Sequence, residues 1–266
     1  MIAAQVLRSL ARQWNLSLDV VEKHYMLGWI LYGISKTSVA KSLAFKGGTS
    51  LSKIYFPSYW RVSEDLDFTV LGSLNFDDAI KTFDEEVAAV LGETGRITLR
   101  RRENPYTNKG YLQYKMGYTG PVGSGMVKIE VSREKFVGET GTRSVPNVPA
   151  EFDYPEFAVM TYALETVVGE KGRAVIERGY IRDYYDLWRL LKEKKFDLRK
   201  ARQAFYEKCK AKGVDFVDIA QFFPDGIAET LRPHLKSGLA RLSREPLPAI
   251  EEILGDLRWS LQGFLP

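Results

Sequence analysis

Hydrophobic positions in the first forty-four residues recur at the three- and four-residue spacing of amphipathic helices. The first group is Val6, Leu10 and Trp14. A second group runs from Val20 to Ile30 and follows Ser17, a residue type that favours helix N-caps. The spacing predicts a helical N-terminal layer over residues 1–44.

Short apolar runs replace this pattern at residues 43–45 and 66–70, with glycines and polar residues between them. They predict a strand, a tight turn, a short helix, a loop and a second strand. An amphipathic helix is then predicted over residues 75–95, with Asn75 as its N-cap and acidic residues in its first turn.

Three runs with strand-like alternation follow at residues 96–102, 111–119 and 126–132 and predict an antiparallel meander. After a proline-containing stretch at 145–157 the periodicity becomes helical. Helices are predicted at residues 160–178, 182–194, 198–212, 216–240 and 247–264. The expected fold class is therefore α+β: a core with a small mixed or antiparallel sheet over residues 1–150, then an all-helical domain over 151–266.

Composition excludes several classes of protein and of metal site. With 45% hydrophobic and 27% charged residues, the chain is neither disordered, collagenous nor a pure coiled coil. One cysteine and two histidines cannot form an intramolecular disulfide or a zinc centre built on these ligands, so a metal would have to bind to carboxylates. No secretory signal and no run of roughly 20 apolar residues is present, which predicts a soluble cytoplasmic protein.

Asp65 and Asp67 form the most chemically informative pair. On a strand they project from one face, while Leu66 and Phe68 project from the other. Two adjacent carboxylates repel each other and favour a hard cation such as Mg²⁺. A lone pair of this kind is more often a solvated strand edge, so its meaning depends on its neighbours.

Gly47 and Gly48 stand at the predicted junction of a strand and a helix, 17 residues upstream of Asp65. Glycines at such a junction let a phosphate approach the backbone amides, and Ser50 and Lys53 add a hydroxyl and an ammonium nearby. A plain tight turn would explain the glycines alone. A phosphate cradle next to a carboxylate pair is a more specific combination.

Alternation in the strand at 126–132 places Lys128, Glu130 and Ser132 on one face. If this strand lies beside Asp65 and Asp67, Glu130 completes a three-carboxylate cluster for two metal ions. The alternative for Glu130 is an ordinary surface position.

The helical half contains a further charged group. Lys171 and Arg178 share a helix face, and Asp183 and Asp186 lie three residues apart on the next helix. Lys171 could hold a nucleotide triphosphate and be oriented by an aspartate; the alternative is an interhelical salt-bridge network.

Three segments in this order resemble the AbiEii family of nucleotidyltransferase toxins, which includes the MenA toxins. They are KGGTSL at 46–51, RVSEDLDF at 61–68, and Glu170-Lys171 followed by RDYYDL at 182–187. The resemblance spans residues 43–192. It implies a polymerase-β-like nucleotidyltransferase core and a helical C-terminal domain. Members act in two-gene toxin–antitoxin or phage-defence systems, and some add nucleotides to the 3′ end of tRNA.

The resemblance also implies roles for individual residues. Asp65 and Asp67 bind Mg²⁺, and Lys171 with Asp183 or Asp186 is essential to transfer. The expected nucleotide-binding residues are Gly47, Gly48, Thr49, Ser50, Lys53, Ser63 and Lys171. One departure is Gly172, which stands where an apolar residue is expected. Together with Gly169 it weakens the predicted helix, each glycine by up to roughly 1 kcal/mol relative to alanine.

Local charge favours an RNA acceptor. The whole chain carries only +4, but residues 189–212 contain ten basic residues and three acidic ones, a local +7. Arg100, Arg101 and Arg102 add a basic strand, and four tyrosines could stack on bases: Tyr106, Tyr111, Tyr114 and Tyr118. The alternatives are a solvated helix face and sheet packing. His24 and His234 are expected to be structural or exposed.

The resulting hypothesis is a Mg²⁺-dependent nucleotidyltransferase, using two ions, that transfers a nucleoside monophosphate from an NTP to a hydroxyl of tRNA or another RNA. It would be a toxin with a separate antitoxin protein and no membrane partner. Two alternatives are AMPylation-like transfer to a protein and a catalytically inactive module that binds RNA or a partner.

Overall fold

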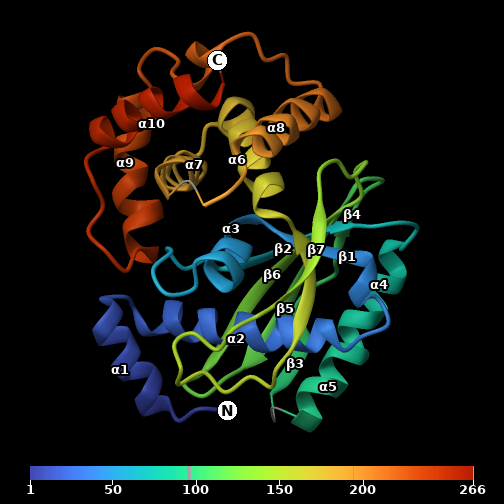
Figure 1. Cartoon of the computed structure of the whole chain (residues 1–266). Helices are drawn as coiled ribbons and strands as arrows, with labels where there is room; N and C mark the ends of the chain where they lie inside the picture. The colour runs from blue at the N-terminus through green and yellow to red at the C-terminus, as the bar shows by residue number, and fades with distance from the viewer. Residues whose placement is uncertain (95–96, 194, 266) are drawn as a thin grey trace. The chain divides into compact units, whose positions relative to one another are not determined.

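The computed structural model describes residues 1–94, 97–193 and 195–265. Its contacts divide the chain into two compact units (Figure 1). Unit 1 comprises Met1–Phe136 and Gly141–Thr161; unit 2 comprises Val137–Thr140 and Tyr162–Pro266. The chain therefore passes between the units three times, and the domain ranges 1–150 and 151–266 stay predictions.

Two helices begin unit 1, as the N-terminal periodicity predicts: α1 (Ala4–Trp14) and α2 (Leu18–Ser35). Nearly every side chain from Val20 to Ile34 is buried, because α2 is apolar around most of its circumference and packs on the sheet and on α5. Ser17 occupies the N-cap position of α2, but its side chain makes no capping hydrogen bond to the backbone.

The described residues contain one eight-stranded mixed sheet, in the order β3-β5-β6-β2-β1-β8-β7, with β4 pairing to β5. The strands are β1 (Leu43–Lys46), β2 (Asp65–Val70), β3 (Thr98–Arg101), β4 (Tyr106–Thr107), β5 (Tyr111–Thr119), β6 (Ser124–Ser132), β7 (Thr140–Ser144) and β8 (Ala158–Tyr162). The meander β3-β5-β6 is antiparallel as predicted, whereas β6 joins β2 in parallel. Arg96, the first residue of the strand predicted at 96–102, lies outside the described residues.

The register of the central strands aligns polar residues across the sheet. Lys46 on β1 faces Asp67 on β2, Asp67 faces Glu130 on β6, and Glu130 faces Gln113 on β5. Leu66 and Phe68 point to the opposite face and are buried, which confirms the predicted alternation. One face of the sheet therefore belongs to the core and the other carries the charged row.

A short helical segment connects β1 to the loop before β2. It comprises α3 (Gly47–Ser50) and a wider π-helical turn over Leu51–Tyr55. Further along, the helix predicted at 75–95 is two helices, α4 (Phe76–Asp84) and α5 (Glu86–Thr94). Asn75 caps α4 as predicted, since its side chain accepts a hydrogen bond from the Asp78 amide at 2.7 Å.

Unit 2 is helical, and α8 (Leu198–Lys212) coincides with its predicted range. The other long helices are α6 (Leu164–Arg178), α7 (Ile181–Glu193), α9 (Ile227–His234) and α10 (Ile250–Phe264). Lys194, the last residue of the helix predicted at 182–194, lies outside the described residues. These findings confirm the α+β class with a helical C-terminal region.

Two predicted helices were wrong in extent. Residues 158–162 form β8 instead of the start of the helix predicted at 160–178, because they pair with β1 and Thr161 donates a hydrogen bond to the Phe45 carbonyl. The helix predicted at 216–240 is interrupted after a short 3-10 turn at Ile219–Phe222. Pro224 lacks an amide donor and Gly226 adopts a φ of 73°, which separates this turn from α9.

Gly169 and Gly172 have a packing function in α6. A methyl group on Gly169 would lie 2.5 Å from the Phe205 backbone nitrogen, and one on Gly172 would lie 2.8 Å from the Phe205 ring. The glycines therefore let α6 and α8 approach closely, which offsets their low helix propensity.

Replacing Gly169 with alanine is expected to destabilise the protein by about 2 kcal/mol, because the methyl group overlaps the α8 backbone. The matched control is Gly255→Ala in α10, where nothing lies within 4 Å of the added methyl group. That change is expected to stabilise by roughly 0.5 kcal/mol through helix propensity. Denaturant unfolding of both variants measures the difference, and equal effects would contradict the packing explanation.

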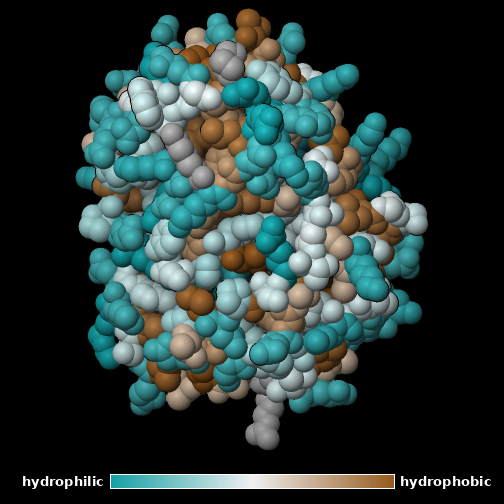
Figure 2. All heavy atoms as spheres, viewed as in Figure 1, coloured by the Kyte–Doolittle hydropathy of each residue, from teal (hydrophilic) through white to brown (hydrophobic). Residues whose placement is uncertain are grey.

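Among the described residues, no helix combines the length and apolarity needed to cross a membrane. On the face drawn in Figure 2, hydrophobic side chains occur in small groups between hydrophilic ones. Scattered apolar groups of this kind are ordinary for a protein surface.

Candidate active site

The carboxylates predicted from the sequence lie together on the charged face of the sheet in unit 1. Asp65 and Asp67 project from β2, and Glu130 on β6 is the direct register partner of Asp67. The parallel pairing of β2 with β6 places these residues side by side although 63 positions separate Asp67 from Glu130.

The surroundings of Asp67 and Glu130 act on their charges in opposite directions. Burial, followed by the nearby Glu130 charge, raises the pKa of Asp67 to about 7. Burial also disfavours the Glu130 carboxylate, but hydrogen bonds from Lys128 and Tyr111 outweigh it and hold the pKa of Glu130 below its usual value. Of the two carboxylates, Asp67 is therefore the one whose ionised form is disfavoured by its surroundings.

The turn after β1 presses directly against Asp67. Gly47 has a φ of 75°, and a side chain there would overlap the Asp67 carboxylate. A methyl group on Gly48 would lie 2.8 Å from the Arg61 guanidinium and 3.4 Å from the Ser63 hydroxyl. The Gly47-Gly48 backbone thus adjoins a carboxylate, a guanidinium and a hydroxyl.

Arg61 is the residue that the sequence interpretation did not place in the site. It is buried, and its guanidinium donates a hydrogen bond to the Val62 carbonyl at 3.3 Å. A guanidinium offers a fork of donors that suits phosphate oxygens. Its position two residues before Ser63 in the RVSEDLDF segment was the available signal.

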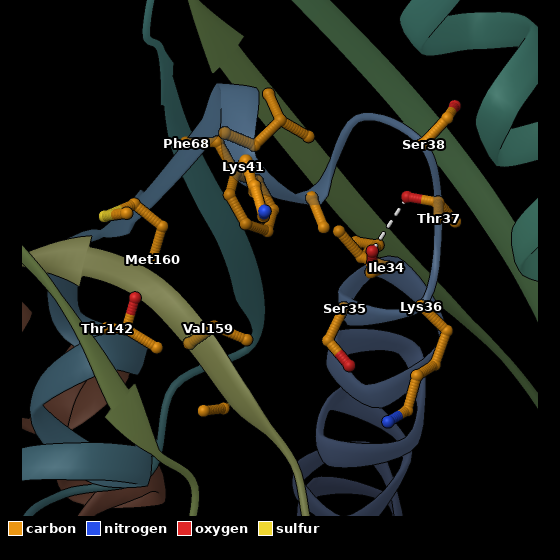
Figure 3. Close-up of a pocket in the computed structure, with 13 residues that line it drawn as sticks. Ile34, Ser35, Lys36, Thr37, Ser38, Lys41, Phe68, Thr142, Val159 and Met160 are labelled. Atoms are coloured by element: carbon orange, nitrogen blue, oxygen red, sulfur yellow. Dashed lines mark hydrogen bonds between the residues drawn. The ribbon is translucent and has the colours of Figure 1, made fainter.

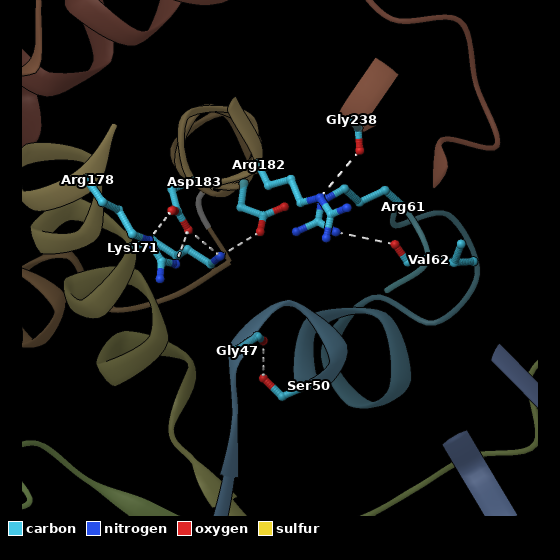
Figure 4. Close-up of polar contacts among 10 residues, drawn as sticks. Gly47, Ser50, Arg61, Val62, Lys171, Arg178, Arg182, Asp183 and Gly238 are labelled. Atoms are coloured by element: carbon cyan, nitrogen blue, oxygen red, sulfur yellow. Dashed lines mark hydrogen bonds and ion pairs between the residues drawn. The ribbon is translucent and has the colours of Figure 1, made fainter. Parts of the chain in front are cut away.

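Thr49, Ser50 and Lys53 are buried, and their side chains make contacts within the protein. Thr49 donates to the Asp65 carbonyl, and Ser50 donates to the Gly47 carbonyl at 2.8 Å (Figure 4). The Lys53 amine donates to the Tyr154 hydroxyl at 3.5 Å and lies 5.1 Å from the Phe152 ring centre. The Thr49 hydroxyl thus fixes the turn against β2, and the Ser50 hydroxyl closes the turn on itself. Nucleotide binding by these three residues stays a prediction.

In unit 2, the Lys171 amine lies between two buried carboxylates (Figure 4). Its Nζ is 2.8 Å from Asp183 Oδ1 and 2.8 Å from Asp186 Oδ2. The Arg178 Nε donates to Asp183 Oδ2 at 2.8 Å. The structure therefore brings together all four residues that the sequence placed in this group.

Asp183 and Asp186 are not equivalent in this network. Burial opposes the charge of Asp183, but Lys171 and Arg178 together hold its pKa well below the usual range. Asp186 is fully buried and lies 2.8 Å from the Lys171 amine. Arg178, which binds Asp183, is about half exposed. Lys171 is thus the cation that both carboxylates share.

The donor set at Asp65 and Asp67 fits a hard divalent cation, because both groups are carboxylates, and a cation would offset the burial and the neighbouring negative charge that disfavour ionised Asp67. Within residues 1–94, 97–193 and 195–265, no group of three or more His, Cys, Asp or Glu is placed to hold a metal ion. Glu130 Oε1 is paired with the Lys128 amine at 2.8 Å. Glu130 as a metal ligand stays a prediction.

Most basic side chains predicted to face RNA are engaged within the protein. Lys208 is buried and pairs with Glu170 at 2.9 Å, and Arg202 donates to the Phe264 carbonyl. Further ion pairs hold Arg189, Lys192, Lys195 and Lys200. The Lys194 charge lies outside the described residues. The local charge of +7 therefore overstates the free cationic surface.

The tyrosines divide in the same way. Tyr114 and Tyr118 are buried core residues, while Tyr106 is 60% exposed. Both histidines follow expectation: His24 is buried against Trp14 and Phe152, and His234 is exposed on α9.

A cavity of about 470 Å³ lies on the other face of the sheet (Figure 3). Phe68, which points away from its neighbour Asp67, contributes to its lining together with the end of α2, β7 and β8. Lys36 and Lys41 are its charged lining residues. It contains none of the predicted site residues.

The chain matches one protein-family model over most of its length. The model described as "Nucleotidyl transferase AbiEii toxin, Type IV TA system" matches residues 29–260. The chain belongs to this family. It is accordingly a nucleotidyltransferase toxin of the type IV toxin–antitoxin class. No curated protein matches the chain.

Solved structures share the AbiEii-family fold of this chain at low sequence identity. MenT4, the nucleotidyltransferase toxin Rv2826c from Mycobacterium tuberculosis H37Rv, aligns with a TM-score of 0.75 and 17% identity, covering 98% of this chain and 88% of that chain. JHP933 from Helicobacter pylori aligns with a TM-score of 0.55 and 17% identity, covering 94% and 93%. A putative nucleotidyltransferase from H. pylori gives 0.53 and 18%, covering 94% and 96%.

Proposed function

We propose that this AbiEii-family protein transfers a nucleoside monophosphate from an NTP to the 3′ hydroxyl of an RNA, with tRNA as the preferred acceptor, and that the reaction depends on Mg²⁺. The observation that carries the proposal is the contact of the Gly47-Gly48 turn with Asp67, Arg61 and Ser63. It supports a phosphate site directly beside a carboxylate pair.

In the proposed reaction the acceptor hydroxyl oxygen attacks the α-phosphorus of the NTP. A new phosphodiester bond forms, the bond to the β-phosphate oxygen breaks, and pyrophosphate leaves with its electron pair. The hydroxyl proton passes to solvent or to a carboxylate. Catalysis of this kind rests mainly on positioning and charge stabilisation.

The turn after β1 would hold the nucleotide phosphates. Backbone at Gly48 lets a phosphate approach closely, because it has no side chain, and Ser63 adds a hydroxyl donor. Arg61 would contact phosphate oxygens through its guanidinium and offset their charge. Thr49 and Ser50 act by fixing the turn through their hydrogen bonds to Asp65 and Gly47.

Asp65 and Asp67 would hold the metal. A bound Mg²⁺ supplies Lewis-acid stabilisation of the phosphate charge that develops in the transition state. A second ion, as predicted, would require Glu130 as an additional ligand beside the two aspartates. Because β2 is paired on both sides, with β1 and with β6, the sheet holds the carboxylates of Asp65 and Asp67 in place.

Lys171 retains its proposed part in transfer, with Asp183 and Asp186 fixing its amine at 2.8 Å each. The proposal for RNA is supported by the family resemblance, by Arg199 and Lys210 on α8, which are exposed, and by exposed Tyr106. A separate antitoxin protein and action in the cytoplasm, where NTPs and tRNA are found, complete the proposal.

Incubation of the protein with each α-³²P-labelled NTP, Mg²⁺ and total tRNA is expected to label the tRNA, and EDTA is expected to abolish the labelling. Asp65→Ala should lose the activity because a proposed metal ligand is removed. The exposed Asp77→Asn in α4 is the matched control and should retain it.

Total cellular RNA and total protein are included as competing acceptors in the same assay. Label in a protein band would select transfer to protein instead of RNA. Absence of any label with all four NTPs, together with a folded circular dichroism spectrum, would overturn the proposed reaction.

A further inference from the structure

The carboxylate cluster of unit 1 carries a cation of its own. Lys128 on β6 is the register partner of Asp65 on β2, and its side chain shares a sheet face with Glu130. Its Nζ lies 2.8 Å from Glu130 Oε1 and 3.7 Å from Asp65 Oδ2. One ammonium therefore bridges carboxylates on two neighbouring strands.

The charges around Lys128 explain why it stays there. Burial works against the ammonium, but Glu130 and Asp65 more than compensate and raise the pKa of Lys128. Asp67, next along the same face, adds further negative potential. Three carboxylates gathered on one sheet face repel each other, and Lys128 offsets part of this repulsion.

A divalent cation and Lys128 compete for the same negative charge. A metal at Asp65 would lie close to an ammonium that is now 3.7 Å from Asp65 Oδ2. Two positive charges a few ångströms apart repel strongly in a partly buried site. Binding of the metal therefore requires Lys128 to withdraw.

We propose that Lys128 is the built-in counter-ion of the carboxylate cluster, which balances Asp65 and Glu130 without metal, moves away when a divalent cation binds, and thereby lowers the affinity of the metal site. This inference rests on the proposed metal site at Asp65 and Asp67.

Two features of the site allow the Lys128 amine to be replaced by a metal ion. Lysine carries a compact charge on a flexible four-carbon stem, and about a third of the Lys128 side chain is exposed, so the amine has space to leave. Glu130 keeps other donors when it does: Gln113 Nε2 lies 3.4 Å from Glu130 Oε1, and the Tyr111 hydroxyl also bonds to this carboxylate. Glu130 thus remains positioned after Lys128 withdraws.

The test measures metal affinity without nucleotide. Mn²⁺ binding to the full chain is followed by electron paramagnetic resonance, and Mg²⁺ by competition. Lys128→Met is expected to bind Mn²⁺ about tenfold more tightly than wild type, because the competing charge is gone. Lys128→Arg, which retains the charge, is expected to stay within about threefold of wild type.

Thermal unfolding provides a second readout. In EDTA, Lys128→Met is expected to have a lower Tm than wild type, because the carboxylates lose their counter-ion, and saturating Mn²⁺ is expected to restore it. Lys128→Gln repeats both measurements in case the methionine side chain disturbs folding. Lys115→Met is the matched control: Lys115 faces Lys128 on β5 but pairs with Glu103 at 2.7 Å.

Unchanged or weaker Mn²⁺ binding by both Lys128→Met and Lys128→Gln, with a normal wild-type affinity, would overturn the counter-ion role and leave the metal site intact. A wild-type protein that binds Mn²⁺ no better than Asp65→Ala would overturn the proposed metal site, and the inference with it.

Discussion

Replacing Asp67 with asparagine is expected to lower the rate of nucleotide transfer at least about a thousandfold and yet to make the protein more stable in EDTA. The rate falls because a proposed metal ligand is lost at the phosphate site, where charge stabilisation supplies most of the catalysis. Stability rises because burial and the Glu130 charge both disfavour the ionised Asp67 carboxylate, whereas asparagine carries no charge.

The direction of the pH dependence follows from the raised pKa of Asp67, about 7 in the folded protein against an ordinary value of 3.8. Between these values the folded protein binds more protons at this group than the unfolded chain does. The free energy of unfolding therefore decreases as the pH rises from about 4 to about 7, and the loss is complete above the folded-state pKa.

Asp67→Asn removes this contribution and is expected to be more stable than wild type by at least about 1 kcal/mol at pH 8, with little difference at pH 4. Urea unfolding in EDTA at both pH values measures the effect, and Asp77→Asn should behave like wild type at each pH. An Asp67→Asn variant that transfers nucleotides at the wild-type rate, or is less stable at pH 8, would contradict the assignment.

Replacing Lys171 with methionine is expected to lower the free energy of unfolding by about 3 to 5 kcal/mol. Lys171 is the shared cation of Asp183 and Asp186, both of which are buried, so its removal leaves two carboxylates short of positive charge. Breaking a buried ion pair from one side is more costly than removing both partners.

The double variant Lys171→Met/Asp186→Asn is therefore expected to recover part of the lost stability, at least about 1 kcal/mol. Arg178→Ala is expected to lower the free energy of unfolding less, because Arg178 is about half exposed and the substitution leaves Lys171 in place. Unfolding in urea at pH 7 provides all four values. A Lys171→Met protein as stable as wild type would show that the network contributes nothing to folding.

This result governs how activity data on Lys171 are interpreted. If Lys171→Met is partly unfolded at the assay temperature, its inactivity reports on folding as well as on catalysis. Activity is therefore compared in the double variant, whose fold is expected to be better preserved. Inactivity in a folded double variant would support a direct role for the Lys171–Asp186 pair in transfer.

Much of the carboxylate face was predictable because a strand has a period of two. The alternation of acidic and apolar residues at 65–68 fixes which side chains share a face, and this holds whichever strands pair. The match of α8 with its predicted range has a similar local cause, because Asp197 caps its start and Gly213 adopts a left-handed φ of 67° at its end.

Features that depend on long-range pairing were not predictable. Residues 158–162 contain too short an apolar run to distinguish a strand from a helix end, and only β1 decides the outcome. Arg61 joins the site through the approach of its guanidinium to Gly48, a contact between residues 13 positions apart that only the folded loop brings together. The net charge of α8 likewise concealed that Lys208 and Arg202 are engaged within unit 2.

The three passages of the chain between the units limit how this protein can be divided genetically. A fragment that begins at Tyr162 lacks Val137–Thr140, although these residues belong to unit 2. It would lose Glu139, whose amide bonds to the Thr166 hydroxyl and whose carbonyl accepts the Ala163 amide at the start of α6. Unit 2 therefore has no single continuous coding segment, and producing it alone requires that residues 137–140 be supplied as an added segment or through a circularly permuted chain.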